Sequence, residues 1–418
     1  MKRSTRVWIG GLAIVALATV AGVAIGGTSS DSAFKGPPLK LLSLGSKGSP
    51  ASDYPDIEVG AAAAARAINK RGGIGGREVI VDFCNTNFNA NDAAACARKA
   101  VSEGYAAVVG YHTGGRDSAV LPTLEQGKVP AIGLESTGIP ADATNPASWP
   151  FQDGTLGSYL TLPYAADALN LKRVVFVRVD IASLAGTSNL MRQAADAGKL
   201  GITFLPDVKV PLTGVTDYSP YAQQIKNSGA QAAIFAVQPG ALSGIAKATE
   251  AIGYKVTWMS NPFNTDEPLL KSIGSSVDGM VLASPFPPFR AAKNLKPIKQ
   301  FTEELALEVK QGNRPADVRY LRPAGLNAWL SVYAVAAAAK QVKGTVDNVS
   351  LWDSLPTMKP MALANGLVIW RPADAGKASF LPRMPGGLLQ LQVVKNGNIV
   401  RLTPRLKSYS GIRSIRGQ

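Results

Sequence analysis

Short runs of β-branched and other apolar residues alternate with alanine-rich or amphipathic stretches over the first third of the chain. Strands are predicted at 39–44, 78–83, 106–109 and 129–133, and helices at 57–69, 90–103 and 118–126. Strands that alternate with helices in this way are typical of βαβ units, whose strands run parallel.

A second set of the same kind begins after Gly157. Helices are predicted at 160–169, 189–197, 221–227 and 241–252, and strands at 173–178, 204–210, 232–237, 256–259 and 280–283. The chain has 418 residues, which is more than one hydrophobic core usually supports. The pattern therefore predicts an α/β fold with two doubly wound parallel-sheet lobes.

The regular alternation of strands and helices ends in the last third of the chain. Two long helices are predicted at 292–311 and 325–341, and two late strands at 366–370 and 388–394. Asn396 and Gly397 form a hairpin turn signal before a last strand at 399–402. A late hairpin at the edge of an otherwise parallel sheet is the expected arrangement.

The amino terminus has the order of an export signal. Lys2, Arg3 and Arg6 precede an uncharged apolar stretch at 7–27, and a polar segment follows up to residue 33. The apolar stretch is also long enough to cross a bilayer, so both a cleaved signal within 1–33 and a retained anchor stay open. Either reading predicts an exported protein, periplasmic or at the cell surface.

The chain has two cysteines, Cys84 and Cys96. Neighbouring cysteines usually pair in an oxidising compartment, so a disulfide is predicted between the end of one strand and the following helix. Two free buried thiols are the alternative.

Charge and composition exclude several function classes. The net charge is +15, but basic residues at both ends contribute much of it, and no cluster of basic and aromatic residues indicates nucleic-acid binding. The chain has one histidine, His112, so no metal site is expected. It also lacks a G-x-S-x-G motif. We therefore expect neither an enzyme nor a cofactor.

Four segments, in order, resemble a known family. They are AINKRGGIGGRE at 67–78, VDFCNTNFNANDAAACARKAV at 81–101, GYAAVVGYHTGG at 104–115 and VPAIGLEST at 129–137. In the first, paired glycines end a helix and return the chain to the sheet. Together they resemble the type I periplasmic binding proteins, in the leucine/isoleucine/valine-binding branch of ABC importers.

This resemblance implies two lobes joined by a three-segment hinge, with crossovers near 153–157, 283–287 and 360–366. The expected first lobe comprises 36–154 plus 286–360, and the second comprises 155–285 plus 361–404. A basic, flexible tail is expected at 405–418. The ligand would lie between the lobes and close them, and the protein would act as a monomer with ABC permease subunits as partners.

Ligands of open α/β sheets bind at the carboxyl ends of the strands. The resemblance selects Tyr54 as a residue that covers the ligand. It also implies a clamp for a ligand carboxylate, and Gln238 and Phe263 are expected to line the second lobe's side. The predicted clamp consists of Thr113, Gly114, Ser136 and Thr137.

Two positions depart from the amino-acid receptors of this family. Gln238 stands where they often carry a tyrosine, and Pro262 stands where they carry a glutamate that pairs with the ligand ammonium. Asp180, Asp266 or Glu267 could replace that glutamate. The resemblance implies a small carboxylate-bearing ligand, such as a branched-chain amino acid. These departures favour a related apolar or aromatic acid or an amide instead. A ligand sensor of the same fold is the alternative to a transport receptor.

Overall fold

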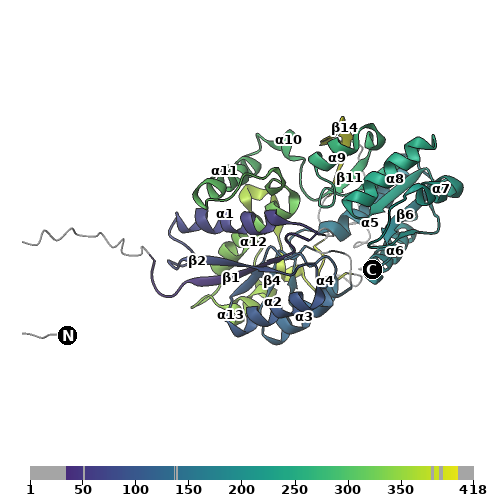
Figure 1. The fold of residues 1–418 in the computed structure, drawn as a ribbon. Coiled ribbons are helices and arrows are strands. Elements are labelled where there is room, and N and C mark those ends of the chain that lie inside the picture. Colours follow the sequence, from purple (N-terminus) through teal and green to yellow (C-terminus); the bar gives the residue numbers. More distant parts are fainter. Residues whose placement is uncertain are drawn as a thin grey trace, which may run out of the picture. The chain divides into compact units, whose positions relative to one another are not determined.

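The computed structural model describes residues 34–49, 52–135, 137, 140–377, 381–385 and 389–402 (Figure 1). The predicted export segment at 1–33, with its apolar stretch at 7–27, and the predicted tail at 405–418 lie outside these residues. None of the helices in the described part combines the length and the apolar character that crossing a membrane requires.

The first lobe is built on a five-stranded parallel sheet in the order β2-β1-β3-β4-β5. Its strands are β1 (Leu39–Gly45), β2 (Val79–Asn85), β3 (Ala107–Val109), β4 (Ala131–Ile132) and β5 (Ser148–Trp149). Its helices are α1 (Pro55–Asn69), α2 (Ala90–Ser102), α3 (Asp117–Gln126), α4 (Pro140–Thr144), α11 (Lys296–Gln311), α12 (Pro323–Ala339) and α13 (Asn348–Ser354).

Alternation along β1 shows how this sheet is covered on both faces. Leu39 and Leu41 pack with α1, α11 and α12, whereas Leu42 and Leu44 pack with α2 and α3 (Figure 1). Because successive side chains of a strand point to opposite faces, one continuous apolar run serves two helical layers.

The second lobe is built on an eight-stranded sheet in the order β15-β14-β11-β10-β9-β6-β7, in which β8 also pairs with β6. Its strands are β6 (Arg173–Val179), β7 (Thr203–Phe204), β8 (Val208–Val210), β9 (Ala232–Ala236), β10 (Thr257–Ser260), β11 (Val281–Ser284), β14 (Gln390–Lys395) and β15 (Asn398–Arg401). Its helices are α5 (Gly154–Ala168), α6 (Ala182–Ala197), α7 (Ser219–Ser228), α8 (Pro239–Ala251) and α9 (Glu267–Ile273), and α10 (Phe289–Ala292) leads back toward α11.

These two sheets confirm the predicted α/β fold. The hairpin of β14 and β15 is antiparallel and turns at Asn396 and Gly397, as predicted. Several bounds differ. The strand predicted at 204–210 is divided into β7 and β8 by a segment that contains Pro206, which cannot donate a ladder hydrogen bond. The helix predicted at 292–311 begins only at Lys296, just before Pro297, where proline is tolerated.

One predicted boundary is wrong. The segment after residue 360 was expected in the second lobe, but β12 (Met361–Leu363) and β13 (Val368–Trp370) form an antiparallel pair on the first lobe. Met361, Leu363 and Trp370 are buried in the core that contains α1 and α12, and the ring of Trp370 lies 6.4 Å from that of Phe151. Burial of the indole holds this hairpin in the first lobe.

Helices α1 and α12 approach each other at a pair of glycines. A Cβ added to Gly60 would lie 2.2 Å from the carbonyl oxygen of Gly325, and one added to Gly325 would lie 3.0 Å from Asp56. The absence of both side chains lets the two backbones touch. This contact matters for function, because the starts of both helices reach the region described next.

Candidate functional site

A cavity of about 340 Å³ lies between the lobes, where strands of both sheets end. The first lobe contributes mainly polar and aromatic side chains, among them Tyr54, His112, Arg319 and Arg322. The second lobe contributes an aliphatic wall made of Val179, Ile181, Leu184, Leu212, Val237 and Leu269. A guest molecule with one polar end and one apolar end would match this asymmetry.

The structure brings most of the predicted site residues to this cavity. Those that line it are Tyr54, Gly114, Thr137, Gln238 and Phe263. Thr113 is fully buried and does not line it, and Ser136 lies outside the described residues. Pro262 lines a separate cavity of about 460 Å³ next to this one.

Tyr54 connects the two lobes. Its hydroxyl donates to Oδ1 of Asn264 at 3.1 Å, and Nδ2 of Asn264 donates to the hydroxyl of Tyr159 at 3.0 Å. Burial, reinforced by the negative charge of Glu135, raises the pKa of Tyr54 well above its ordinary value. The phenol therefore stays protonated at every physiological pH and keeps its hydrogen bond to Asn264.

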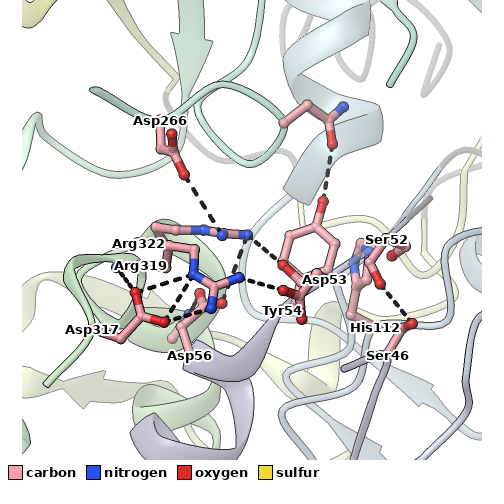
Figure 2. A network of polar contacts seen from close by, with 12 residues as sticks. Ser46, Ser52, Asp53, Tyr54, Asp56, His112, Asp266, Asp317, Arg319 and Arg322 are labelled. Atoms are coloured by element: carbon pink, nitrogen blue, oxygen red, sulfur yellow. Dashed lines mark hydrogen bonds and ion pairs between the residues drawn. The ribbon is translucent and has the colours of Figure 1, made fainter. Parts of the chain in front are cut away.

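Arg322 is the most buried cation at the cavity, with 9% of its surface exposed. Its Nη2 donates to the carbonyl oxygen of Asp53 at 3.1 Å, and its guanidinium carbon lies 4.9 Å from the centre of the Tyr54 ring. The carboxylates of Asp266 and Asp56 lie 3.6 and 3.8 Å from its nitrogens (Figure 2). Burial works against its charge, but these carboxylates outweigh burial and raise the pKa of Arg322.

Arg319 lies beside Arg322 but is bound more tightly. Its Nε and Nη2 donate to the carboxylate of Asp317 at 2.9 and 2.6 Å, and its Nη1 pairs with Asp53 (Figure 2). The hydrogen bonds from Arg319 lower the pKa of Asp317, and the same pair raises the pKa of Arg319. This arginine is thus held in place by the protein itself.

His112 lines the cavity and belongs to a buried polar group that crosses between the lobes. Its Nδ1 lies 3.2 Å from the carboxylate of Glu135, which also accepts a 2.6 Å hydrogen bond from the hydroxyl of Thr155. The imidazole packs 4.3 Å from the Tyr54 ring. Ring packing and one carboxylate partner are thus enough to explain why this histidine is buried.

Two residues of the predicted carboxylate clamp, Thr113 and Thr137, already have hydrogen-bond partners within the protein. The backbone N–H of Thr137 donates to Asp142 at 2.7 Å, and its hydroxyl donates to Asp117 at 3.2 Å. The hydroxyl of Thr113 accepts from the backbone N–H of Arg116 at 3.0 Å. Both donors of Thr137 are therefore engaged by carboxylates of the protein itself, and the clamp stays a prediction.

The two second-lobe residues of the prediction have different surroundings. Nε2 of Gln238 donates to the carbonyl oxygen of Leu212 at 2.7 Å, so this amide holds a loop of the aliphatic wall. Phe263 is 2% exposed and packs 6.5 Å from Phe286, between centroids. Both residues shape the cavity more than they offer free polar groups to it.

Asp56 lies behind Arg322 and makes a testable contribution to stability. It is fully buried, its Oδ2 accepts from the backbone N–H of Gly325 at 2.7 Å, and burial raises its pKa to about 6. Because this folded-state pKa lies above the value of about 3.9 expected in the unfolded chain, the contribution of Asp56 to stability is greatest below pH 4 and is lost as pH rises through 6.

We expect Asp56→Asn to gain stability relative to the natural protein by about 2–3 kcal/mol as pH rises from 4 to 7. Urea unfolding of both proteins at several pH values measures this difference. Asp317→Asn is the matched control, because the pKa of Asp317 is lowered and its contribution to stability is lost only below about pH 4, so its difference from the natural protein should stay nearly flat from pH 4 to 7. A difference for Asp56→Asn that stays flat or falls over this range would contradict the prediction.

Comparisons with known proteins agree with this geometry. A family model described as "Periplasmic binding protein" matches residues 41–380. The chain matches no curated protein sequence.

Several solved structures share the fold. A solute-binding protein of an ABC transporter from R. palustris, in complex with 4-hydroxybenzoate, has a TM-score of 0.70 and 19% identity over 89% of this chain and 97% of that one. A second from R. palustris, in complex with benzoate, has a TM-score of 0.69 and 16% identity over 89% and 96%. A leucine-binding protein from Thermotoga maritima has a TM-score of 0.66 and 17% identity over 87% and 98%.

Proposed function

Because the chain belongs to the periplasmic binding protein family, we propose that it is the extracytoplasmic solute receptor of an ABC importer. This family consists of binding proteins rather than enzymes, and membership implies a place outside the cytoplasm. The proposal includes export through the segment at 1–33, action as a monomer, and delivery of the bound solute to permease subunits in the membrane.

The cavity between the lobes is the observation that carries this proposal. A polar end from the first lobe and an aliphatic wall from the second enclose about 340 Å³. A solute that contacts both sides stabilises the closed arrangement and not the open one, which is how ligand binding drives hinge closure. The contacts of Tyr54 with Asn264 and of Arg322 with Asp266 already join the lobes in this arrangement.

The same lining supports a small apolar or aromatic acid as the solute. Rings of Tyr54, Phe88, Tyr159 and Phe263 line the cavity together with the aliphatic wall, and arginines stand at its polar end. The two R. palustris proteins of this fold were solved with 4-hydroxybenzoate and benzoate, which are acids of this class. Pro262 lines the neighbouring cavity and not this one, and it has no carboxylate for a ligand ammonium.

Calorimetric titration of the purified protein with a panel of acids tests the proposal. Asp266, the candidate partner for a ligand ammonium that lines this cavity, already lies 3.6 Å from Arg322. We therefore expect benzoate, 4-hydroxybenzoate or cyclohexanecarboxylate to bind at least about tenfold more tightly than leucine, isoleucine or valine, since a buried ammonium without a partner of its own costs more than about 1.4 kcal/mol. Tighter binding of leucine would overturn the ligand class but not the receptor role. Failure of every acid and amino acid to bind would overturn both.

A further inference from the structure

A ligand carboxylate buried in the cavity needs an opposite charge, because an unpaired buried anion is very costly. Among the described residues that line the cavity, the two guanidinium groups belong to Arg319 and Arg322. Both come from the segment that precedes α12, and both contact Asp53 (Figure 2).

Arg319 has little capacity left for a ligand. Its Nε and Nη2 bind Asp317 and its Nη1 binds Asp53, so all three of its nitrogens already face carboxylates. A ligand carboxylate could approach this group only by displacing Asp53 or Asp317. Such an exchange of one carboxylate for another would contribute little to affinity.

Arg322 differs in this respect. It makes one hydrogen bond, from Nη2 to the carbonyl oxygen of Asp53, and its two carboxylate neighbours lie at 3.6 and 3.8 Å, beyond hydrogen-bond distance. A guanidinium has five N–H donors in a planar fork that fits a carboxylate in a bidentate manner. The ring of Tyr54, whose centre lies 4.9 Å from the guanidinium carbon, packs beside this fork.

The other candidate for an anion site disfavours a negative charge. The loop residue Thr137 already donates from its backbone and its hydroxyl to Asp142 and Asp117, and both of these aspartates are fully buried. A ligand anion placed there would lie close to two buried acids and would find these donors engaged.

We infer that Arg322 holds the carboxylate of a monoanionic ligand in a bidentate pair and so makes this protein selective for acids over their neutral amides. This inference rests on the proposed function and names the residue that recognises its ligand. The ligand's apolar body then extends from the ring of Tyr54 toward the aliphatic wall of the second lobe.

Asp56 competes with the ligand for the same guanidinium. Its carboxylate lies 3.8 Å from Arg322 and is held from behind by the N–H of Gly325. Asparagine at this position retains the oxygen that accepts from Gly325 but carries no charge. Removal of this charge from beside Arg322 should therefore strengthen the binding of an anion and leave a neutral ligand unaffected.

Titration of benzoate and benzamide at pH 7.5 tests the inference, because these probes have nearly the same shape and differ in charge. Arg322→Gln should weaken benzoate binding about 100-fold, and benzamide binding by less than about threefold, since a buried charge pair is lost only for the acid. Asp56→Asn should tighten benzoate binding about fivefold relative to benzamide. Arg314→Gln is the matched control, since Arg314 is also ion-paired, with Glu58 and Glu308, and is partly buried, but does not line the cavity; the benzoate affinity of this variant should not change.

Two results from a folded Arg322→Gln variant would overturn this inference and leave the proposed function standing. One is an unchanged affinity for benzoate, and the other is an equal fall in the affinities for benzoate and benzamide. If Arg322→Gln does not fold, Asp56→Asn decides, and an unchanged or weaker preference for benzoate counts against Arg322. If the natural protein binds no acid of the panel, the proposed ligand class fails and the inference fails with it.

Discussion

Replacement of Gly60 by alanine is expected to lower the free energy of unfolding by about 3 kcal/mol, the upper end for overpacking in a core. The added Cβ would lie 2.2 Å from the carbonyl oxygen of Gly325, where α1 crosses α12. Both atoms belong to or adjoin the backbone, so no flexible side chain can move aside. The helices must separate, and the loss of packing extends along a long interface.

The same substitution should also weaken ligand binding. Tyr54 and Asp56 lie at the start of α1, and Arg322 lies at the start of α12. When the two helices move apart, the geometry between Tyr54 and Arg322 changes. Urea unfolding measures the first effect, and benzoate titration of the folded variant measures the second.

Gly240→Ala provides the control for helix propensity. Gly240 lies in α8, and a Cβ added there meets nothing within 4 Å. Alanine should therefore stabilise the protein by about 0.5–1 kcal/mol at this position. If Gly60→Ala were as stable as the natural protein, the close contact between α1 and α12 would not exist as described.

Such contacts mark the limit of what the sequence could predict. Strands β1, β6 and β9 were predicted well because they are buried on both faces and appear as continuous apolar runs. The pattern could not predict that Gly60, in an alanine-rich helix, is required for a helix crossing. That requirement comes from Gly325, which is far away in the sequence.

The late strands show a related limit. The hydrophobic pattern found a strand at 366–370, and β13 lies there, but it could not show which lobe buries Trp370. A single apolar face fits against either core. Only the tertiary contact with Phe151 decides, and no local feature of the sequence encodes that partner.

The candidate site residues that directly follow strands could be predicted, because ligands of open α/β sheets bind at the carboxyl ends of the strands. That rule and the family resemblance placed Tyr54, Thr137 and Phe263 near the ligand, and all three line the cavity. Arg319 and Arg322 were missed because they follow no strand and lie between two helices. One feature of the sequence could have indicated Arg322: it stands directly before a long apolar helix, and a charged residue at the end of a buried helix usually has polar or charged partners.

The hydrogen-bond partners of the predicted clamp could not be predicted from the sequence either. The spacing correctly placed Thr113 and Thr137 on loops near the cavity, but hydrogen-bond donors satisfy whichever acceptors are nearest. Asp117 and Asp142 come from helices that follow these loops, and they accept from the two donors of Thr137. The local sequence shows which residues carry hydrogen-bond donors, but it does not show which acceptors these donors will bind in the fold.

Removal of the disulfide should have an effect of similar size to that of Gly60→Ala. The structure confirms the predicted bond between Cys84 of β2 and Cys96 of α2, which are 12 residues apart. Closing a loop of this length contributes about 3 kcal/mol by restricting the unfolded chain. We therefore expect a reducing agent, or the double variant Cys84→Ser and Cys96→Ser, to lower the free energy of unfolding by about that amount.

The loop that this bond closes also reaches the ligand site. Phe88 lies within it, lines the cavity and packs against the guanidinium of Arg116, whose carbon lies 3.4 Å from the ring centre. Reduction should therefore weaken benzoate binding as well, although less than Arg322→Gln does, because Phe88 contributes packing and no charge. A reducing agent should leave the double variant unchanged. Two titratable thiols in the unreduced protein, or an unfolding midpoint indifferent to reduction, would show that the bond does not stabilise this part of the first lobe.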